Sequence, residues 1–421
     1  MKRSIFSAIL MAVCLVGAVS CTENEMDATA PEKTVNPNVR TPEEALRIAN
    51  DAAHLLDKAS TRATARTAGS LRSVQTVREF ETRSVGTGFT SDTLMYIVNY
   101  DDEQGFAVVS ANPQTADLLA LTEDGSYYTY DDCEVEGFND FIEMAKFYVQ
   151  NSELVQDFIG PLKPLLPDTT YVYNIPPNLV SWGQNEPTGT YCPNGICGCV
   201  PTATAQICAY YGRPTSINLT YPNADLSVQP LVWDSIRLHR LTPPITEPNP
   251  SLYCTASENS HRALGRFCRQ LGQMMNSSYG LTSTSTQKSS IIPCFTELGY
   301  TCGSWTDYSS ECTRASIMAN RKVYMAGQSS EGGHAWLVDG YMLRSYSSGG
   351  IPELGNNEIV SEYYNHVNWG WNGRYNGYFA DGVFTVNNCF RRDASPYPLL
   401  NSLNISFYDV QYIVPVPNPG S

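Results

Sequence analysis

Positive charge is scarce in this chain: its 421 residues hold 27 Lys and Arg against 42 Asp and Glu, a formal net charge of −15. Proteins that bind nucleic acids usually present a basic face, so this balance argues against a nucleic-acid partner. Long apolar runs are also missing after residue 20, where no stretch approaches the roughly 20 residues of a membrane-spanning helix. No internal repeat is evident, which excludes a solenoid.

Metal-ligand spacings are absent as well. The stretch YCPNGICGCVPTATAQICAYYG, residues 191–212, brings together four cysteines, Cys192, Cys197, Cys199 and Cys208. Structural zinc sites use close cysteine pairs with a second pair at a set distance. The first three cysteines here are five and two residues apart, and no close histidine pair follows, so we expect no metal and no other cofactor. The redox motif C-x-x-C is also absent, which leaves disulfide halves or a nucleophile with structural neighbours.

Apolar residues, in contrast, are plentiful. Hydrophobic residues make up 42% of the chain and aromatic residues 11%. This content is ample for packed cores and excludes a disordered protein. The length suits two or three domains.

The N-terminal end resembles an export signal, which we expect over residues 1–20. Lys2 and Arg3 precede a short apolar run, and the small residues of GAVSC lead to Cys21. This ending resembles a bacterial lipoprotein signal, in which the cysteine is lipidated and becomes the new N-terminus. Ordinary secretion with cleavage nearby is the alternative. We expect an exported protein, anchored by lipid at Cys21 to the outer surface or in the periplasm, or released to the extracellular space.

Export makes disulfide bonds permissible. Of the 13 cysteines, Cys14 lies in the signal and Cys21 at the anchor, which leaves eleven. Because that number is odd, at least one thiol stays unpaired if all the others form bridges.

Residues 21–158 are expected to form a tether followed by a small α+β domain. A capping-box pattern, TPEE, starts a helix over 40–58. The stretch 59–87, rich in Ser, Thr and Arg, is expected to be a flexible loop. TLMYIVNY and FAVVSA, around the turn DDEQG, predict a hairpin, LLALT predicts another strand, and 139–150 predicts an amphipathic helix. Nothing in this domain forms a convincing catalytic set.

The stretch 159–180 carries five prolines and cannot form a long helix. We interpret it as an extended linker, and an exposed linker is a natural site of proteolytic cleavage. The second domain then spans residues 181–421.

The residues after Cys199 predict a helix, with Pro201 early and Gly212 at its end. Cys199 would therefore stand at a helix N-terminus, where unpaired N–H groups and the helix dipole stabilise a thiolate. Such a nucleophile still needs a base, and an imidazole is the usual one.

The chain has only five histidines, and two of them stand in conspicuous motifs. His334, in EGGHAWLVDGY, precedes a predicted buried strand with a turn after it. His366 lies in YYNHVNWGWNGRYNGYF, where strand alternation puts Asn368 on the same face as His366. An amide such as Asn368 can accept a hydrogen bond from an imidazole N–H and hold the ring. The ring of Trp369 would cover that bond.

GCVPTATAQ, GGHAWLVDGY and HVNWGWNG…NGYF, in this order, resemble the streptopain-type cysteine peptidases, a papain-like family. WGQ, residues 182–184, resembles that family's oxyanion-hole segment, and YIVNYDDEQGFAVVSA resembles part of its inhibitory pro-domain. The resemblance covers most of the chain. It implies an α+β fold: a papain-like peptidase with two subdomains, one helical and one of antiparallel strands, behind a small α+β pro-domain.

The resemblance also implies a role for each matching residue. Cys199 matches the nucleophile and His334 the base. Asn368 matches the position that orients the histidine, and Trp369 the ring beside it. Gln184 matches the oxyanion donor, helped by the backbone N–H of Cys199. Cys192 and Cys197 are additional to the simplest members and are expected to be structural, a role open to halves of disulfides with unidentified partners, while Cys208 is expected in the core.

The resemblance implies an endopeptidase made as a zymogen, with proteins or peptides as substrates and its own pro-domain as an intramolecular inhibitor. One alternative is a catalytically inactive binding lipoprotein on a peptidase fold. Others are an inhibitor acting through the first domain, and a transglutaminase-like acyl transferase that shares the Cys–His chemistry. The Pro-rich stretch 213–260 and the Ser- and Gly-rich stretch 342–361 are expected to be loops that reshape the substrate cleft.

Overall fold

The computed structural model describes eleven ranges of the chain: 39–59, 74–81, 93–128, 133–152, 171–174, 180–217, 229–237, 256–328, 332–347, 359–386 and 410–419. Residues Pro37–Ser421 form one compact unit. The expected signal, the lipid anchor and most of the linker lie outside the described ranges. Within these ranges, no helix combines the length and apolar character that a membrane crossing needs.

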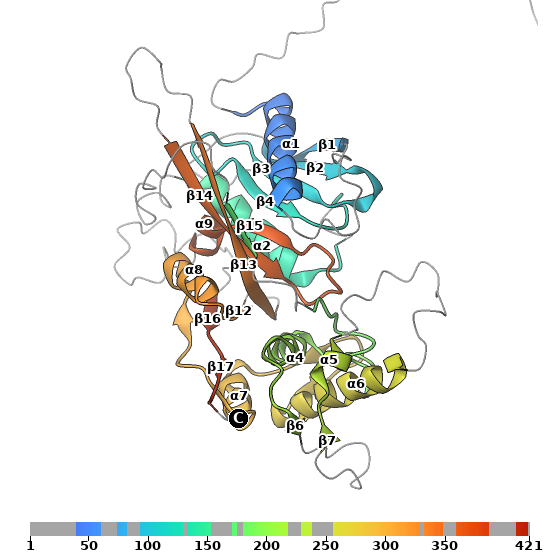
Figure 1. Cartoon of the computed structure of the whole chain (residues 1–421). Coiled ribbons are helices and arrows are strands. Elements are labelled where there is room, and N and C mark those ends of the chain that lie inside the picture. The colour runs from blue at the N-terminus through green and yellow to red at the C-terminus, as the bar shows by residue number, and fades with distance from the viewer. Residues whose placement is uncertain are drawn as a thin grey trace, which may run out of the picture. The chain divides into compact units, whose positions relative to one another are not determined.

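The N-terminal region, residues 39–152, largely follows the prediction. Helix α1 (Pro42–Ala59) begins with the expected capping box: the N–H of Thr41 donates to Oε2 of Glu44 at 2.8 Å, and the N–H of Glu44 to Oγ1 of Thr41 at 3.3 Å. Strands β2 (Thr93–Tyr100) and β3 (Phe106–Ser110) pair as the predicted hairpin, and β4 (Leu118–Thr122) pairs with β3. Helix α1 packs against these strands (Figure 1).

Two predictions for this region need correction. Part of the expected loop 59–87 is a strand, β1 (Val74–Glu81), which pairs antiparallel with β2 at the edge of the sheet. An edge strand is held by backbone hydrogen bonds and needs few apolar side chains, so composition did not reveal it. Helix α2 (Glu136–Gln150) begins three residues before the predicted start, because its N-cap residue Val135 offers no side-chain cap that a sequence could signal.

The C-terminal region, residues 180–419, combines helices with antiparallel strands. Its main helices are α4 (Cys199–Tyr211) and α6 (Ala256–Met274), which pack together (Figure 1). Its main strands are β12 (Val323–Gln328), β13 (Gly333–Ser347), β14 (Ile359–Asn368), β15 (Gly377–Ala380) and β16 (Gln411–Ile413). Its shorter elements are β6 (Ser216–Ile217), β7 (Gln229–Pro230), α5 (Trp233–Ile236), β8 (Ser278–Tyr279), β9 (Thr284–Ser285), α7 (Ile291–Glu297), β10 (Tyr300–Thr301), β11 (Thr306–Asp307), α8 (Ser310–Met318), α9 (Asp381–Phe384) and β17 (Val416–Pro417), and the strand β5 (Tyr171–Asn174) precedes the region. Single 3-10 turns lie at Asp101–Glu103 and Lys288–Ser290.

One sheet joins the two regions. Its strand order is β1-β2-β3-β4-β15-β14-β13-β12-β16-β11, and β5 pairs with β13 beside this path. The junction is β4 with β15, where Leu121 lies opposite Tyr378 and Ala120 opposite Phe379. The N-terminal region is therefore bonded through its backbone to the edge of the C-terminal sheet.

Strand β13 separates two hydrophobic cores. Trp336 and Val338 belong to the core shared with the N-terminal region, whereas Ala335 and Leu337 belong to the core around α4 and α6. The turn expected after AWLVDGY is absent, because β13 continues past Tyr341 and ends at Ser347, with a register shift against β14 between Val338 and Gly340. Asp339 and Gly340 form a β-bulge and not a turn. Residues 342–347 and 359–361 of the expected loop 342–361 are therefore parts of β13 and β14.

The fold class is α+β, as the sequence predicted. Residues 171–174 of the expected linker form β5, antiparallel to residues 340–343 of β13.

Candidate active site

Cys199 is the first residue of α4, as the sequence predicted. Gly198 precedes it with φ of 92°, and a Cβ there would stand 3.0 Å from the carbonyl oxygen of Thr284. Only glycine tolerates that backbone and that approach. The helix ends at Gly212 in the left-handed conformation, also as predicted. The sulfur therefore lies beside the unpaired N–H groups at the beginning of the helix.

The loop before α4 bonds the backbone of Gln184 to that of Cys197, two residues before the nucleophile. The N–H of Cys197 donates to the backbone oxygen of Gln184 at 2.7 Å, and the N–H of Gly183 to Oδ1 of Asn372 at 2.8 Å. The side-chain nitrogen of Gln184 is buried without a hydrogen-bond partner. A buried amide donor that has no partner is costly, so the site holds a donor that a ligand oxygen can satisfy.

His334 lies near the start of β13 and is almost fully buried. Its Nε2 contacts the backbone oxygen of Trp369 at 3.0 Å, and its Nδ1 is buried without a partner. Because a carbonyl can only accept, Nε2 carries the proton and Nδ1 presents the lone pair of a base. Burial lowers the pKa of His334 to about 4, against the opposite influence of the Trp369 carbonyl, so the ring is neutral at pH 7.

The backbone of Ala335, the residue after His334, lies close enough to the Cys199 thiol to lower its pKa, against the larger effect of burial. The fold thus brings the Cys199 thiol close to the segment that carries His334, which lies 135 positions later in the sequence. Burial, followed by smaller contributions that include the nearby Glu136 carboxylate, raises the pKa of Cys199 to about 11. The thiol and the imidazole are therefore both neutral at pH 7, and this state of the chain holds no thiolate–imidazolium pair.

The position of Asn368 differs from the expectation that it holds the imidazole. Asn368 lies opposite Leu337 in the β13–β14 ladder, and directly paired residues share a face of the sheet. That face belongs to the core around α4, whereas the His334 ring stacks with Trp336 on the other face. Asn368 accordingly donates to the backbone oxygen of Val180 and to Oε1 of Gln206, and accepts from the N–H of Gly370. The backbone of Trp369 holds the ring instead.

Trp369 lies where the sequence placed it, beside the histidine. Its ring is 6.5 Å from that of His334, centroid to centroid, and 5.5 Å from that of Trp336. All three side chains are buried. The aromatic rings keep water from the Nε2 hydrogen bond.

The first turn of α2, from the N-terminal region, lies on this site. A Cβ at Gly137 would stand 2.5 Å from Cδ2 of His334 and 2.6 Å from the Trp369 ring. Glu136, the residue before it, is close enough to raise the pKa of Cys199, and its own pKa is raised by burial. Sequence reasoning missed both residues. The only signal was a glycine in the first turn of a helix, where glycine is unfavourable.

Two buried ionic groups also join the regions. Arg344 binds the Asp117 carboxylate with both guanidinium nitrogens and lies 3.5 Å from Glu362. His366 contacts Asp339 through Nδ1 and lies 3.5 Å from Glu123 through Nε2. These two carboxylates outweigh the effect of burial and raise the pKa of His366 to about 10.

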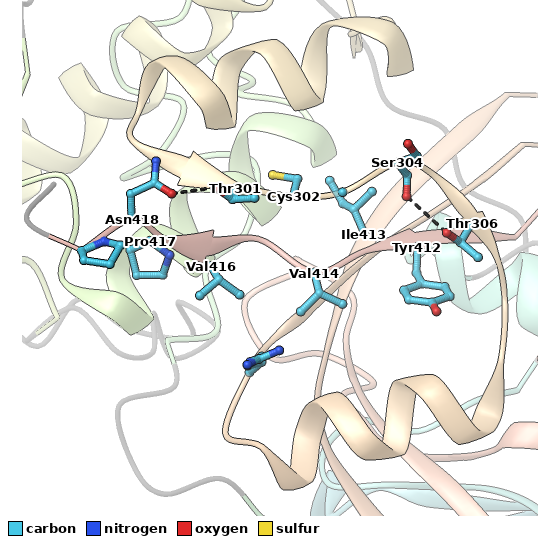
Figure 2. A pocket seen from close by; sticks show the side chains of 13 residues that line it. Thr301, Cys302, Ser304, Thr306, Tyr412, Ile413, Val414, Val416, Pro417 and Asn418 are labelled. Carbon is cyan, nitrogen blue, oxygen red and sulfur yellow. Dashed lines mark hydrogen bonds between the residues drawn. The ribbon is translucent and has the colours of Figure 1, made fainter.

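A pocket of about 540 Å³ lies elsewhere, between the segment around β10 and the C-terminal strands (Figure 2). Thr301, Cys302, Tyr412 and Val416 are among its lining residues, and none of the five candidate site residues is. In the described part of the chain, no group of three or more His, Cys, Asp or Glu is arranged to hold a metal ion. At the candidate site, Cys199 offers a thiol, His334 an imidazole and Gln184 an amide donor.

Comparisons with known proteins match both regions of the chain. Residues 182–379 match the Peptidase C10 family, and residues 36–151 match the Spi protease inhibitor family. Streptopain from Streptococcus pyogenes and streptopain from its serotype M1 are each 25% identical over 334 residues, which covers 69% of this chain and 75% of theirs. A solved fragment of Prevotella intermedia prointerpain A superposes with a TM-score of 0.50 at 20% identity, over 81% of this chain and 98% of the fragment. That last likeness shows the fold alone.

Proposed function

We propose that this chain, a cysteine peptidase with a Peptidase C10 domain behind a Spi-type inhibitor domain, is an exported endopeptidase whose pro-domain blocks Cys199 and His334 until it is removed. The observation that carries the proposal is the contact of Gly137 with His334, because it lies between the two matched domains and excludes any substrate from the imidazole. The pro-domain here is residues 39–152.

The reaction follows from the unpaired atoms of the site. Once α2 leaves, Nδ1 of His334 takes the proton of the Cys199 thiol, and the thiolate attacks the carbonyl carbon of a peptide bond. The carbonyl oxygen becomes an anion, which the side-chain nitrogen of Gln184 and the backbone N–H of Cys199 stabilise. The imidazolium then protonates the leaving amine.

The second half of the reaction restores the enzyme. His334 takes a proton from a water molecule, which attacks the thioester between the acyl group and Cys199. The carboxylic acid product leaves as Cys199 regains its proton. The backbone oxygen of Trp369 keeps the imidazole in one orientation through both halves, since it fixes the proton on Nε2.

Maturation is proposed to occur by cleavage in the Pro-rich linker, residues 159–180. Export, with lipidation at Cys21, would hold the zymogen at the outer surface or in the periplasm, and the cut would separate the enzyme from that anchor. Mass spectrometry of the N-termini of both the zymogen and the matured enzyme tests these statements, since a lipid would mark Cys21 of the zymogen and the cut would set the first residue of the enzyme. A mature chain that begins inside residues 39–152 would contradict the proposed cut.

The catalytic roles are tested with a peptidyl electrophile that labels active-site thiols. The matured enzyme should be labelled at Cys199, and the His334→Ala variant should lose this labelling. Cys312, which is exposed, reports non-specific alkylation in the same sample. The Cys199→Ala zymogen should stay full-length if processing is autocatalytic. Hydrolysis that persists at the wild-type rate in Cys199→Ala would overturn the assignment of the nucleophile.

A further inference from the structure

Three asparagines at a four-residue spacing, Asn368, Asn372 and Asn376, lie at the end of β14 and in the turn that follows it. Each of them is hydrogen-bonded to the segment 180–183, which lies 188 to 195 positions earlier in the sequence. This segment leads directly to Gln184, the amide donor of the candidate site. The steps of the peptidase reaction described above involve neither Asn372 nor Asn376.

The bond from Asn372 is the one next to the amide donor. Its Oδ1 accepts the N–H of Gly183 at 2.8 Å, and Gly183 directly precedes Gln184. A Cβ at Gly183 would stand 2.7 Å from Cγ of Asn372, so this close approach requires a glycine. Asn372 itself has φ of 56°, in the left-handed region that asparagine tolerates better than most residues. Both residue types are therefore suited to this contact.

Asn376 connects the same segment with the residue that holds the imidazole. Its Oδ1 accepts the N–H of Trp369 at 3.1 Å, and its Nδ2 donates to Oγ of Ser181 at 3.3 Å. The backbone oxygen of Trp369 in turn accepts from Nε2 of His334. One turn of the chain therefore holds both the base and the segment that leads to the amide donor.

The start of this segment is held without Asn372. Nδ2 of Asn368 donates to the backbone oxygen of Val180 at 3.0 Å, and the N–H of Trp182 donates to Oε1 of Gln206, on α4, at 3.1 Å. Loss of the Asn372 side chain should therefore leave the segment in place. It should release only the residue that directly precedes the donor.

We propose that Asn372 is a positioning residue: by holding the N–H of Gly183, it keeps the amide of Gln184 directed at the carbonyl oxygen that becomes an anion. This role rests on the proposed function, in which Gln184 is the oxyanion donor. No hydrogen bond fixes the side-chain nitrogen of Gln184 in the inhibited chain, so its position depends on the backbone on either side. The N–H of Cys197 holds the backbone oxygen of Gln184, and Asn372 holds the residue before it. Such donors must be placed in advance, and a misplacement of about 1 Å can cost about 100-fold in rate.

The test compares Asn372→Gly with Asn372→Asp. Glycine removes the acceptor and adopts the left-handed backbone without strain, whereas aspartate keeps an acceptor oxygen at the same place. Each variant is made as the full chain, matured by immobilised wild-type enzyme and assayed with a peptide substrate. Asn372→Gly should lower kcat about tenfold and leave KM within about twofold of the wild-type value. Asn372→Asp should recover most of the lost kcat.

The variant Gln184→Ala decides whether Asn372 acts through Gln184. In this background the further change Asn372→Gly should lower kcat by less than about twofold, because the donor that Asn372 positions is already gone. An equal drop in both backgrounds would show a purely structural effect and overturn the proposal. A wild-type kcat in Asn372→Gly, with a slow Gln184→Ala, would overturn it as well. A wild-type kcat in Gln184→Ala itself would instead refute the donor role of Gln184 under the proposed function, and the positioning role with it.

Two controls separate this effect from damage to the nucleophile and from the glycine itself. Iodoacetamide alkylates Cys199 by displacement of iodide, without forming an oxyanion, so Asn372→Gly should react at the wild-type rate. Slower alkylation would place the defect at Cys199 and His334 and contradict the proposal. Asn276→Gly makes the same change at an exposed asparagine with φ of 52° and should keep the wild-type kcat. An equal loss of kcat in Asn276→Gly would attribute the effect to the added glycine and overturn the positioning role.

Discussion

Gly137 of the pro-domain lies against the imidazole of His334, so closely that a methyl group at position 137 would stand 2.5 Å from Cδ2 of the ring. Non-bonded carbon atoms do not approach this closely, so α2 would have to move away from His334 if residue 137 carried a methyl group. The pro-domain thus covers the base with a residue that has no side chain. Burial under this turn also keeps the base neutral.

Gly137→Ala should weaken inhibition without unfolding the pro-domain. Alanine favours a helix more than glycine does, so α2 itself gains stability while its contact with His334 and Trp369 is lost. We expect the uncleaved zymogen to react with a thiol-directed probe at least about tenfold faster, as for a loss of about 1.4 kcal/mol in docking. Glu143→Ala, on the exposed side of the same helix, is the matched control and should label at the wild-type rate. Equal rates in both variants would show that the contact does not inhibit.

Glu136→Gln should make the zymogen thiol more reactive. The Glu136 carboxylate raises the pKa of Cys199, so its removal lowers that pKa and increases the thiolate fraction at pH 7. Burial is the larger cause and persists, so the increase in labelling rate should be modest, about threefold. Under the proposed cut in the linker, the matured enzyme lacks residue 136 and serves as the internal reference. A lower labelling rate in Glu136→Gln than in the wild-type zymogen would rule out this electrostatic effect.

His366 should hold the pro-domain at neutral pH and release it in strong alkali. Its folded pKa of about 10 is above the ordinary value of 6.5, so its contribution is fully present below pH 6.5 and is lost as the pH rises through about 10. The groups that face it are Asp339, Glu123 and the ring of Tyr378. The thermal midpoint of the zymogen should exceed that of His366→Gln at pH 7, and the gap should close beyond pH 10. A gap that stays constant over this range would contradict a charged His366.

Local sequence signals predicted the helix that carries the nucleophile. The features that the sequence did not predict depend on strand pairing between distant segments. The capping box of α1, and the glycine and proline around α4, act within one helical turn, so their effects could be inferred directly. The strand β1 and the bulge at Gly340 depend on partners far along the chain. The pairing register of β13 with β14 also explains where the side chain of Asn368 lies. Alternation along one strand was predictable, but the residue opposite Asn368 was not, and that residue decides which core its side chain enters.

Asn368→Ala should act mainly on stability. The variant leaves the backbone oxygen of Val180 and the N–H of Gly370 without their buried partners, and each such loss costs about 1–3 kcal/mol. We expect the free energy of unfolding to fall by about 2–4 kcal/mol. The pH dependence of kcat/KM should keep its wild-type midpoint, because the Trp369 backbone holds His334. A shifted midpoint with unchanged stability would instead support the orienting role that the sequence had indicated.

Gln184→Ala should slow the chemical step and leave substrate binding nearly unchanged. The side-chain nitrogen of Gln184 has no partner in the inhibited chain, so its hydrogen bond is available for the anion that forms in the transition state. Removing one such donor typically lowers kcat about 10²-fold to 10³-fold. KM should change little, because the neutral carbonyl of the substrate interacts weakly with this donor.

Two further variants separate this effect from damage to the loop. Gln184→Glu keeps the size of the side chain but sets a carboxylate against the developing anion, so its kcat should be at least as low as that of Gln184→Ala. Asn185→Ala changes the exposed neighbour and should keep the wild-type kcat. If Gln184→Ala raised KM with kcat unchanged, the amide would bind the ground state, and the anion would have to be stabilised by the backbone N–H groups at the start of α4 alone. A kcat that is lower in Gln184→Glu than in Gln184→Ala would exclude this stabilisation by the backbone alone. Only a charge that faces the developing anion distinguishes the two variants.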